Sequence, residues 1–130
     1  MSVASHSYEV LCVEDDPDIA RVLQLMVEAV PGHRALVAAD GRTALDLIGR
    51  HHVRLAFLDL GLPDVDGVQL LRELRQRCPR LPVVVVTAYH DRRREALAAG
   101  ASGFVGKPFD PEQIVQIVER HDDRRTGGAG

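Results

Sequence analysis

The sequence predicts an α/β fold built around one open parallel sheet, and two observations support this prediction. Five short apolar segments alternate along the chain with five segments of helical periodicity. The third and fourth apolar segments, VRLAFLDL and PVVVVTAY, are almost continuously apolar, which is typical of strands covered on both faces of a sheet. Because connections between parallel strands are right-handed, the helices are expected on both faces.

The apolar segments define the expected strands. They lie at residues 8–13, 34–39, 53–60, 82–89 and 103–106. The second of them is expected at one edge of the sheet.

The expected helices begin at recognisable capping residues. Asp16 can cap the first helix, and Pro17 suits its first position. Asp110 and Pro111 repeat this arrangement before the fifth helix, where Gln113 can complete a capping box. The helices between them are expected at 41–51, 67–77 and 91–100.

Composition and length indicate one soluble domain. The chain has 130 residues, of which 27% are charged, and its net charge of −3 provides no basic field for nucleic acid. No apolar run approaches the roughly 20 residues needed to cross a bilayer, and the start MSVASHSYE lacks the pattern of a signal peptide. We therefore expect a cytoplasmic domain over residues 1–125, with a Gly-rich tail at 126–130 and no nucleic-acid or membrane partner.

Chemically reactive side chains stand at the carboxyl ends of the expected strands, where open α/β sheets bind ligands. Glu14 and Asp15 follow the first strand, Asp59 ends the third, Thr87 the fourth, and Lys107, the only lysine of the chain, follows the fifth. These residues are expected to meet on one rim of the sheet.

Grouped carboxylates on this rim repel one another unless a cation joins them, and oxygen ligands suit Mg²⁺. Glu14 and Asp15 are interpreted as metal ligands, whereas Asp16 is interpreted as a helix cap. Asp59 either caps the turn GLPD or acts as a nucleophile toward phosphorus, forming an aspartyl phosphate. A metal and the ammonium of Lys107 could stabilise charge on the transferring group.

Four sequence blocks resemble the receiver domains of bacterial two-component response regulators. They are EDDP at 14–17, DLGLPDVDG at 59–67, TAY at 87–89 and GFVGKPF at 103–109. Their order and spacing match over roughly residues 8–121. The resemblance implies a flavodoxin-like (βα)5 three-layer sandwich, with a parallel five-stranded sheet in the order 2-1-3-4-5.

The resemblance implies a phosphoacceptor and a metal site. Asp59 matches the phosphoacceptor of the family. Glu14 and Asp15 match the acidic pair that holds Mg²⁺ together with Asp59, and Gly61 matches the position whose backbone carbonyl completes that site.

The resemblance also implies roles for residues at the last two strands. Thr87 matches the switch hydroxyl that bonds the phosphoryl group, and Ala88 the backbone N–H that does so. Lys107 matches the lysine that pairs with a phosphoryl oxygen, and Phe104 the aromatic switch. Pro108 matches the proline that follows through a cis bond.

The implied function is a phosphorylation-controlled signalling switch rather than an enzyme, catalysing only its own phosphorylation and dephosphorylation. A histidine kinase or histidine phosphotransfer protein would supply the phosphoryl group. The face made by the fourth helix, fifth strand and fifth helix would change shape and meet a downstream effector or a second copy.

Three other functions share part of this pattern. A Mg²⁺-dependent phosphatase of the haloacid dehalogenase type also uses an aspartate, but after its first strand and with a second Asp two residues later, where this chain has Gly61. A flavodoxin-like cofactor module requires a phosphate loop where this chain has EDDP. A receiver that only docks is opposed by the complete set of Asp59, Thr87 and Lys107.

Residues near the expected switch have weaker signals. Tyr89 either shields the phosphoryl group from water or is a surface aromatic of the switch face. The arginines at 92–94 are interpreted as a solvated face rather than a partner contact, and His90 receives no role. His51 and His52 are expected near the C-terminus of the second helix.

Overall fold

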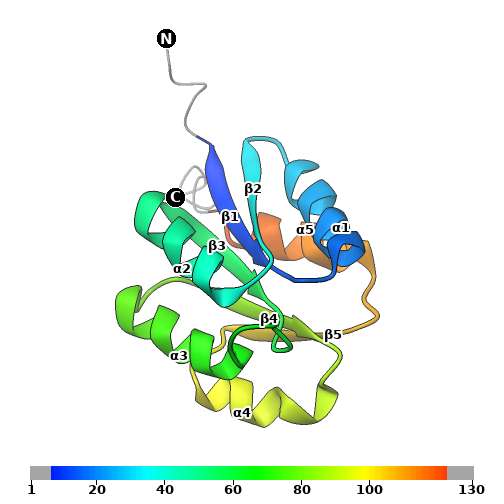
Figure 1. Cartoon of the computed structure of the whole chain (residues 1–130). Coiled ribbons are helices and arrows are strands. Elements are labelled where there is room, and N and C mark those ends of the chain that lie inside the picture. Colours follow the sequence, from blue (N-terminus) through cyan, green and yellow to red (C-terminus); the bar gives the residue numbers. More distant parts are fainter. Residues whose placement is uncertain (1–6, 123–130) are drawn as a thin grey trace.

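The computed structural model describes residues 7–122 and contains a five-stranded parallel sheet in the order β2-β1-β3-β4-β5. Helices α1 and α5 cover one face of the sheet, and α2, α3 and α4 lie on the other (Figure 1). The predicted fold and strand order are therefore confirmed. The tail expected at 126–130 lies outside the described residues. Between residues 7 and 122, no helix is both long and apolar enough to cross a membrane.

The elements follow the predicted alternation. The strands are β1 (Tyr8–Val13), β2 (His33–Ala38), β3 (Val53–Leu58), β4 (Val83–Thr87) and β5 (Gly103–Gly106). The helices are α1 (Pro17–Glu28), α2 (Gly41–Arg50), α3 (Gly67–Arg77), the short 3₁₀ helix η2 (His90–Arg92), α4 (Arg93–Ala98) and α5 (Pro111–Arg120).

The apolar segments overestimate three strands at their carboxyl ends, β2 by one residue and β3 and β4 by two residues each. β3 ends at Leu58, so Asp59 is the first residue after the strand rather than part of it. β4 ends at Thr87, after which the chain turns at once into η2. The fourth helix is also shorter than predicted, because its first turn is the 3₁₀ helix and α4 itself covers only Arg93–Ala98. Both strand ends matter because site residues stand there.

The strand side chains alternate between two apolar cores, one on each face of the sheet. Leu11 and Leu58 pack in the core on the side of α3, whereas Cys12 and Phe57 pack in the core on the side of α1 and α5. Burial, with a contribution from the charge of Glu28, raises the pKa of the Cys12 thiol to about 12. Cys12 therefore behaves as a small buried apolar residue.

Aspartates cap four of the helices. Asp16 caps α1, and Asp110 forms a capping box with Gln113 at the start of α5, as predicted. Asp40 caps α2 and Asp66 caps α3, two further caps that were not predicted. These caps fix the points at which the chain leaves the rim of the sheet.

A buried contact joins the end of α5 to the amino ends of the strands. The Nε2 atom of His33, at the start of β2, lies 3.6 Å from Oδ2 of Asp122. The His33 ring also meets the Tyr8 ring edge to face, with 5.3 Å between centroids. Both described ends of the chain therefore lie at the amino end of the sheet (Figure 1).

One arginine binds the loops that lie near the C-terminal end of α3. The guanidinium of Arg75 donates to the carbonyl oxygens of Leu81 and Gly100, both at 2.6 Å, and to those of Cys78 and Pro79 at 3.2 and 3.3 Å. Gly100 has a φ of 107°, in the left-handed region that favours glycine. Arg75 thus joins the loop after α3 to the loop after α4.

Arg75→Ala is expected to lower the free energy of unfolding by about 2–4 kcal/mol, because several carbonyl oxygens lose a charged donor together. The measurement is urea denaturation. Arg77→Ala is the matched control, because Arg77 makes only an exposed i,i+4 pair with Glu73 and its loss should cost about 0.5 kcal/mol or less. Equal effects of the two substitutions would contradict the role given to Arg75.

Candidate functional site

Two carboxylates and one ammonium group meet where three strands end. Glu14 follows β1, Asp59 follows β3 and Lys107 follows β5. The Nζ atom of Lys107 lies 2.7 Å from Oε1 of Glu14 and 3.0 Å from Oδ2 of Asp59. Residues separated by up to 93 positions in the sequence are therefore in direct contact, at the rim that the parallel order predicts.

The backbone of each of these residues is held by a bond that continues the sheet. Glu14 donates its N–H to the carbonyl of Ala38 at 2.9 Å, and Asp59 donates to Val13 at 3.0 Å. Lys107 likewise donates its N–H to the carbonyl of Thr87 at 2.9 Å. The sheet thus fixes the backbone from which each of these side chains extends.

A third carboxylate completes an acidic cluster. Among the described residues, carboxylate oxygens of Glu14, Asp15 and Asp59 lie within 4.8 Å of one another. Such a group of oxygen donors suits a hard divalent cation. The carboxylate of Asp16 instead accepts the N–H groups of Asp18 and Ile19, which agrees with its predicted role as a cap.

The cluster carries more negative than positive charge when its carboxylates are ionised. Glu14 is only 2% exposed, and burial raises its pKa, with the charge of Asp59 adding to the effect. Burial alone would lower the pKa of Lys107, but its hydrogen bonds to Glu14 and Asp59 outweigh this and raise the pKa. Lys107 is therefore an ammonium ion near neutral pH, facing an excess of carboxylates.

The remaining predicted residues surround this cluster. Thr87 is fully buried at the end of β4, and its Oγ1 accepts the N–H of Tyr89 at 3.3 Å. The Lys107–Pro108 peptide bond is cis. Phe104 on β5 is half-buried and packs against the core on the side of α3.

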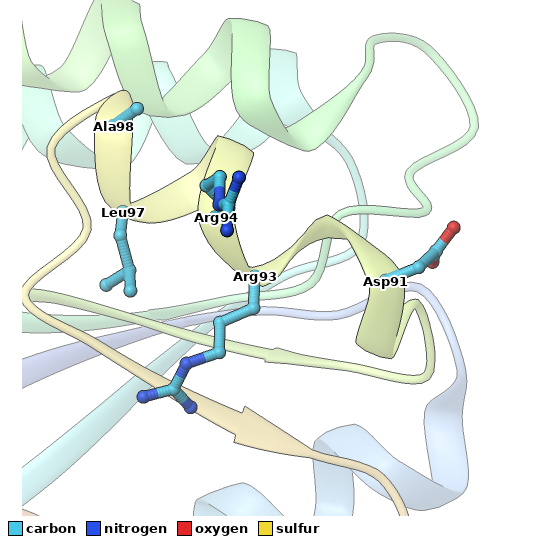
Figure 2. Close-up of a pocket in the computed structure, with 5 residues that line it drawn as sticks. All are labelled: Asp91, Arg93, Arg94, Leu97 and Ala98. Carbon is cyan, nitrogen blue, oxygen red and sulfur yellow. The ribbon is translucent and has the colours of Figure 1, made fainter.

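An arginine from α4 covers Phe104. The guanidinium carbon of Arg93 lies 5.8 Å from the centroid of the Phe104 ring. Figure 2 shows Arg93 and Leu97 extending from α4 toward β5. Both residues, with Asp91 and Arg94, line a surface pocket on this side of α4. The predicted aromatic switch residue is thus covered on one side by an arginine that is itself exposed.

Gly61 and Tyr89 fit each other across the rim. A Cβ atom at Gly61 would lie 2.9 Å from Cε2 and 3.2 Å from the hydroxyl oxygen of Tyr89. The Gly61 N–H also donates to Oδ1 of Asp59 at 3.3 Å. The Tyr89 ring therefore covers the loop that leaves Asp59, a position open to it because residue 61 has no side chain.

The interpretation of residues 92–94 as a solvated face is wrong for Arg92. Its guanidinium binds both carboxylate oxygens of Asp66, at 2.6 and 3.0 Å, and Oε1 of Glu95 at 2.8 Å. The hydrogen bonds from Arg92 hold the pKa of the Asp66 carboxyl below its ordinary value. Arg92 thus ties the segment after β4 to the cap of α3, whereas Arg93 and Arg94 are exposed.

Two further contacts at the rim were not predicted. The Nε2 atom of His90 lies 2.7 Å from the carbonyl oxygen of Lys107. Asp64 accepts the N–H groups of Gly41 and Arg42, at 2.8 and 3.0 Å, and so holds the loop after β3 against the start of α2. Neither contact has a signal in the local sequence, because the partners are 17 or more residues apart.

Comparison with known proteins gives matches to a protein family and to bacterial regulatory proteins. Residues 10–119 match the family described as the response regulator receiver domain. The regulatory protein AtoC of Escherichia coli is 36% identical over 113 residues, covering 85% of this chain and 24% of AtoC. The transcriptional regulatory protein PhoP of Escherichia coli is 34% identical over 120 residues, covering 91% of this chain and 53% of PhoP. The chain thus spans about a quarter to a half of these relatives.

A solved structure gives the same match in three dimensions. The receiver domain of a Francisella response regulator superposes with a TM-score of 0.82 at 29% sequence identity. The superposition covers 92% of this chain and 99% of the Francisella chain.

Asp15→Asn is expected to raise the melting temperature of the metal-free protein by about 2–4 °C, because it removes one of three neighbouring negative charges. The gain should shrink in mild acid: Glu14, whose pKa is raised, takes up a proton as the pH falls, which already relieves the repulsion. Thermal unfolding in a chelator at several pH values tests this. Asp91→Asn removes an exposed acid outside the cluster and is the control; a gain as large there would refute the explanation.

Proposed function

The chain belongs to the response regulator receiver domain family, and from this premise we propose that it is a phosphorylation-controlled switch of a two-component pathway with Asp59 as its phosphoacceptor. The observation that carries the proposal is the ammonium of Lys107, which bridges Asp59 and Glu14 beside Asp15. A carboxylate in this setting can act as a nucleophile, and the cation beside it can stabilise the charge of the incoming group.

For transfer of the phosphoryl group, the protein mainly has to position the reacting groups and stabilise their charge. A carboxylate oxygen of Asp59 bonds to phosphorus, and the bond between phosphorus and the donor, a phosphohistidine or an acyl phosphate, breaks. The donor takes the electron pair with it. Lys107 then exchanges its contact with Asp59 for one with a phosphoryl oxygen, and the backbone N–H of Ala88 donates to another.

We propose Mg²⁺ as the cofactor, held by the carboxylates of Glu14, Asp15 and Asp59 and by the backbone carbonyl of Gly61. The acidic cluster supports this, because its donors are oxygens and its charge is in excess over Lys107. Bound Mg²⁺ would neutralise part of the charge on the transferring group and align it with the acceptor. The carboxylates must be ionised to bind it, so affinity should fall as Glu14 is protonated.

The output would follow from the buried hydroxyl of Thr87. When Thr87 moves to donate to the phosphoryl group, its contact with the Tyr89 N–H is lost and space opens beneath β5. Phe104 can turn into that space and release Arg93 from its ring. The face made by α4, β5 and α5 would then meet a downstream effector or a second copy, a local charge event acting on a two-state element.

A histidine kinase or phosphotransfer protein is the proposed donor, and the cytoplasm, where such donors act, is the proposed location. The relatives AtoC and PhoP are regulators by name and longer than this chain, so the output of this chain is a proposal of its own. The phosphatase alternative is not favoured: the acceptor candidate follows β3, not β1, and residue 61 is glycine.

Incubation with Mg²⁺ and acetyl phosphate is expected to add one phosphoryl group to the protein, observed as an increase in intact mass. Asp59→Ala should abolish the adduct, and Asp91→Ala, which removes an exposed acid away from the cluster, should retain it. An adduct that survives in Asp59→Ala would place the acceptor elsewhere. Absence of any adduct in the unchanged protein would refute the proposed function.

Tyr89→Ala is expected to speed loss of the phosphoryl group about two- to fivefold, a change of about 0.4–1 kcal/mol in the barrier. The reason is that the ring covers the loop after Asp59 and limits the approach of water. Decay of the adduct, followed by mass after removal of acetyl phosphate, measures the effect. Tyr89→Phe should decay at the original rate, as should Leu97→Ala, which removes another exposed apolar side chain. An unchanged rate in Tyr89→Ala would show that the ring is only part of the surface.

A further inference from the structure

We propose that His90 is a positioning residue for Lys107. It fixes the Lys107 backbone, from which the lysine side chain reaches the phosphoryl group. The inference rests on the proposed function, because it concerns the lysine of that same site. Its basis is the contact of 2.7 Å between Nε2 of His90 and the carbonyl oxygen of Lys107.

The backbone of Lys107 is held at both of its polar groups by one segment of the chain. Its N–H donates to the carbonyl of Thr87, the last residue of β4, at 2.9 Å. Its C=O accepts a hydrogen bond from His90, which lies in η2 three residues after Thr87. The segment that carries the switch hydroxyl therefore also orients the residue that carries the ammonium.

The chemistry of the contact identifies the donor. A backbone carbonyl can only accept a hydrogen bond, so Nε2 of His90 must carry the proton. The proposed role therefore requires an N–H at Nε2 and makes no use of a charge on the ring.

The residue before Lys107 is shaped to admit the His90 ring. A Cβ atom at Gly106 would lie 2.9 Å from Nε2 and 3.1 Å from Cδ2 of His90. The backbone of Gly106 is not in the left-handed region, so glycine is not required there for its conformation. The absence of a side chain at 106 instead leaves the space that the ring occupies.

Positioning at the backbone matters because the lysine side chain is long and flexible. Its ammonium meets Glu14 and Asp59 at the far end of four methylene groups. A small rotation of the Lys107 peptide would displace the start of that stem and so alter where the ammonium can reach. The hydrogen bond from His90 to the Lys107 carbonyl limits that rotation.

The first test compares the rate of adduct formation from acetyl phosphate in four proteins. His90→Ala is expected to slow it about three- to tenfold, the effect of losing one hydrogen bond that orients a reacting group. His90→Gln should restore most of the rate, because its amide nitrogen can donate at the same distance from the backbone. His52→Ala, which removes an exposed histidine at the amino end of β3, is the control and should match the unchanged protein.

Two further readouts separate positioning from a general loss of structure. The affinity for Mg²⁺, measured by calorimetry, and the melting temperature should be the same in His90→Ala and His90→Gln as in the unchanged protein. A merely structural role would lower both in His90→Ala, and this result would overturn the inference.

The second test uses the space at Gly106. Gly106→Ala should displace the His90 ring and slow adduct formation to the level of His90→Ala. In the double variant the two effects should not multiply, because the added methyl group then has no ring to displace. Multiplying effects would show that Gly106 acts independently of His90 and would count against the inference.

The outcomes distinguish this inference from the proposed function. If the unchanged protein forms no adduct on Asp59, the proposed function fails and the inference fails with it. If the unchanged protein forms the adduct and His90→Ala forms it as fast, or if His90→Gln restores nothing, the inference alone fails.

Discussion

The contact of one ammonium group with carboxylates from two different strands is the interaction on which the site depends. Lys107 approaches Glu14 and Asp59 only because β1, β3 and β5 run in the same direction and end at the same rim. The order and direction of the apolar strands thereby set the positions of these charged groups. Reversing or displacing any one of these strands would leave a buried carboxylate without its cation, which is strongly unfavourable.

The same rim brings carboxylates of like charge close together. Burial raises the pKa of Glu14, and Asp59 adds to the effect, so the acidic cluster is held together against its own repulsion. The two apolar cores on the faces of the sheet supply the stability that this arrangement uses. A cation bound among these carboxylates would relieve part of their mutual repulsion.

The sequence was sufficient for features that are periodic or that lie at the ends of apolar strands. The alternation of strands and helices, the helix caps at Asp16 and Asp110 and the meeting of Asp59 with Lys107 all follow from such patterns. The full strand order was implied only by the resemblance to receiver domains. Contacts between side chains on different loops have no such pattern. Within a run of three arginines, nothing local indicates that Arg92 alone reaches Asp66.

The predicted carboxyl ends of three strands were also wrong, because the hydropathy of the sequence does not indicate where strand hydrogen bonding stops. LAFLDL reads as one apolar run, yet the strand ends before Asp59. That residue keeps a single ladder bond to Val13 and turns its carboxylate to the rim. Asp59 thus stands where the strand has ended although the apolar run of the sequence continues. The three-dimensional structure shows this point, and hydropathy does not.

The buried contact between His33 and Asp122 has a consequence for how such a domain can be combined with others. It holds the end of α5 beside the start of β1, at the end of the sheet opposite the acidic cluster. The described chain therefore begins and ends on the side of the sheet opposite Asp59. A further module joined at residue 7 or 122 would start away from the acidic cluster, so the two ends of the described chain and the cluster do not compete for the same surface.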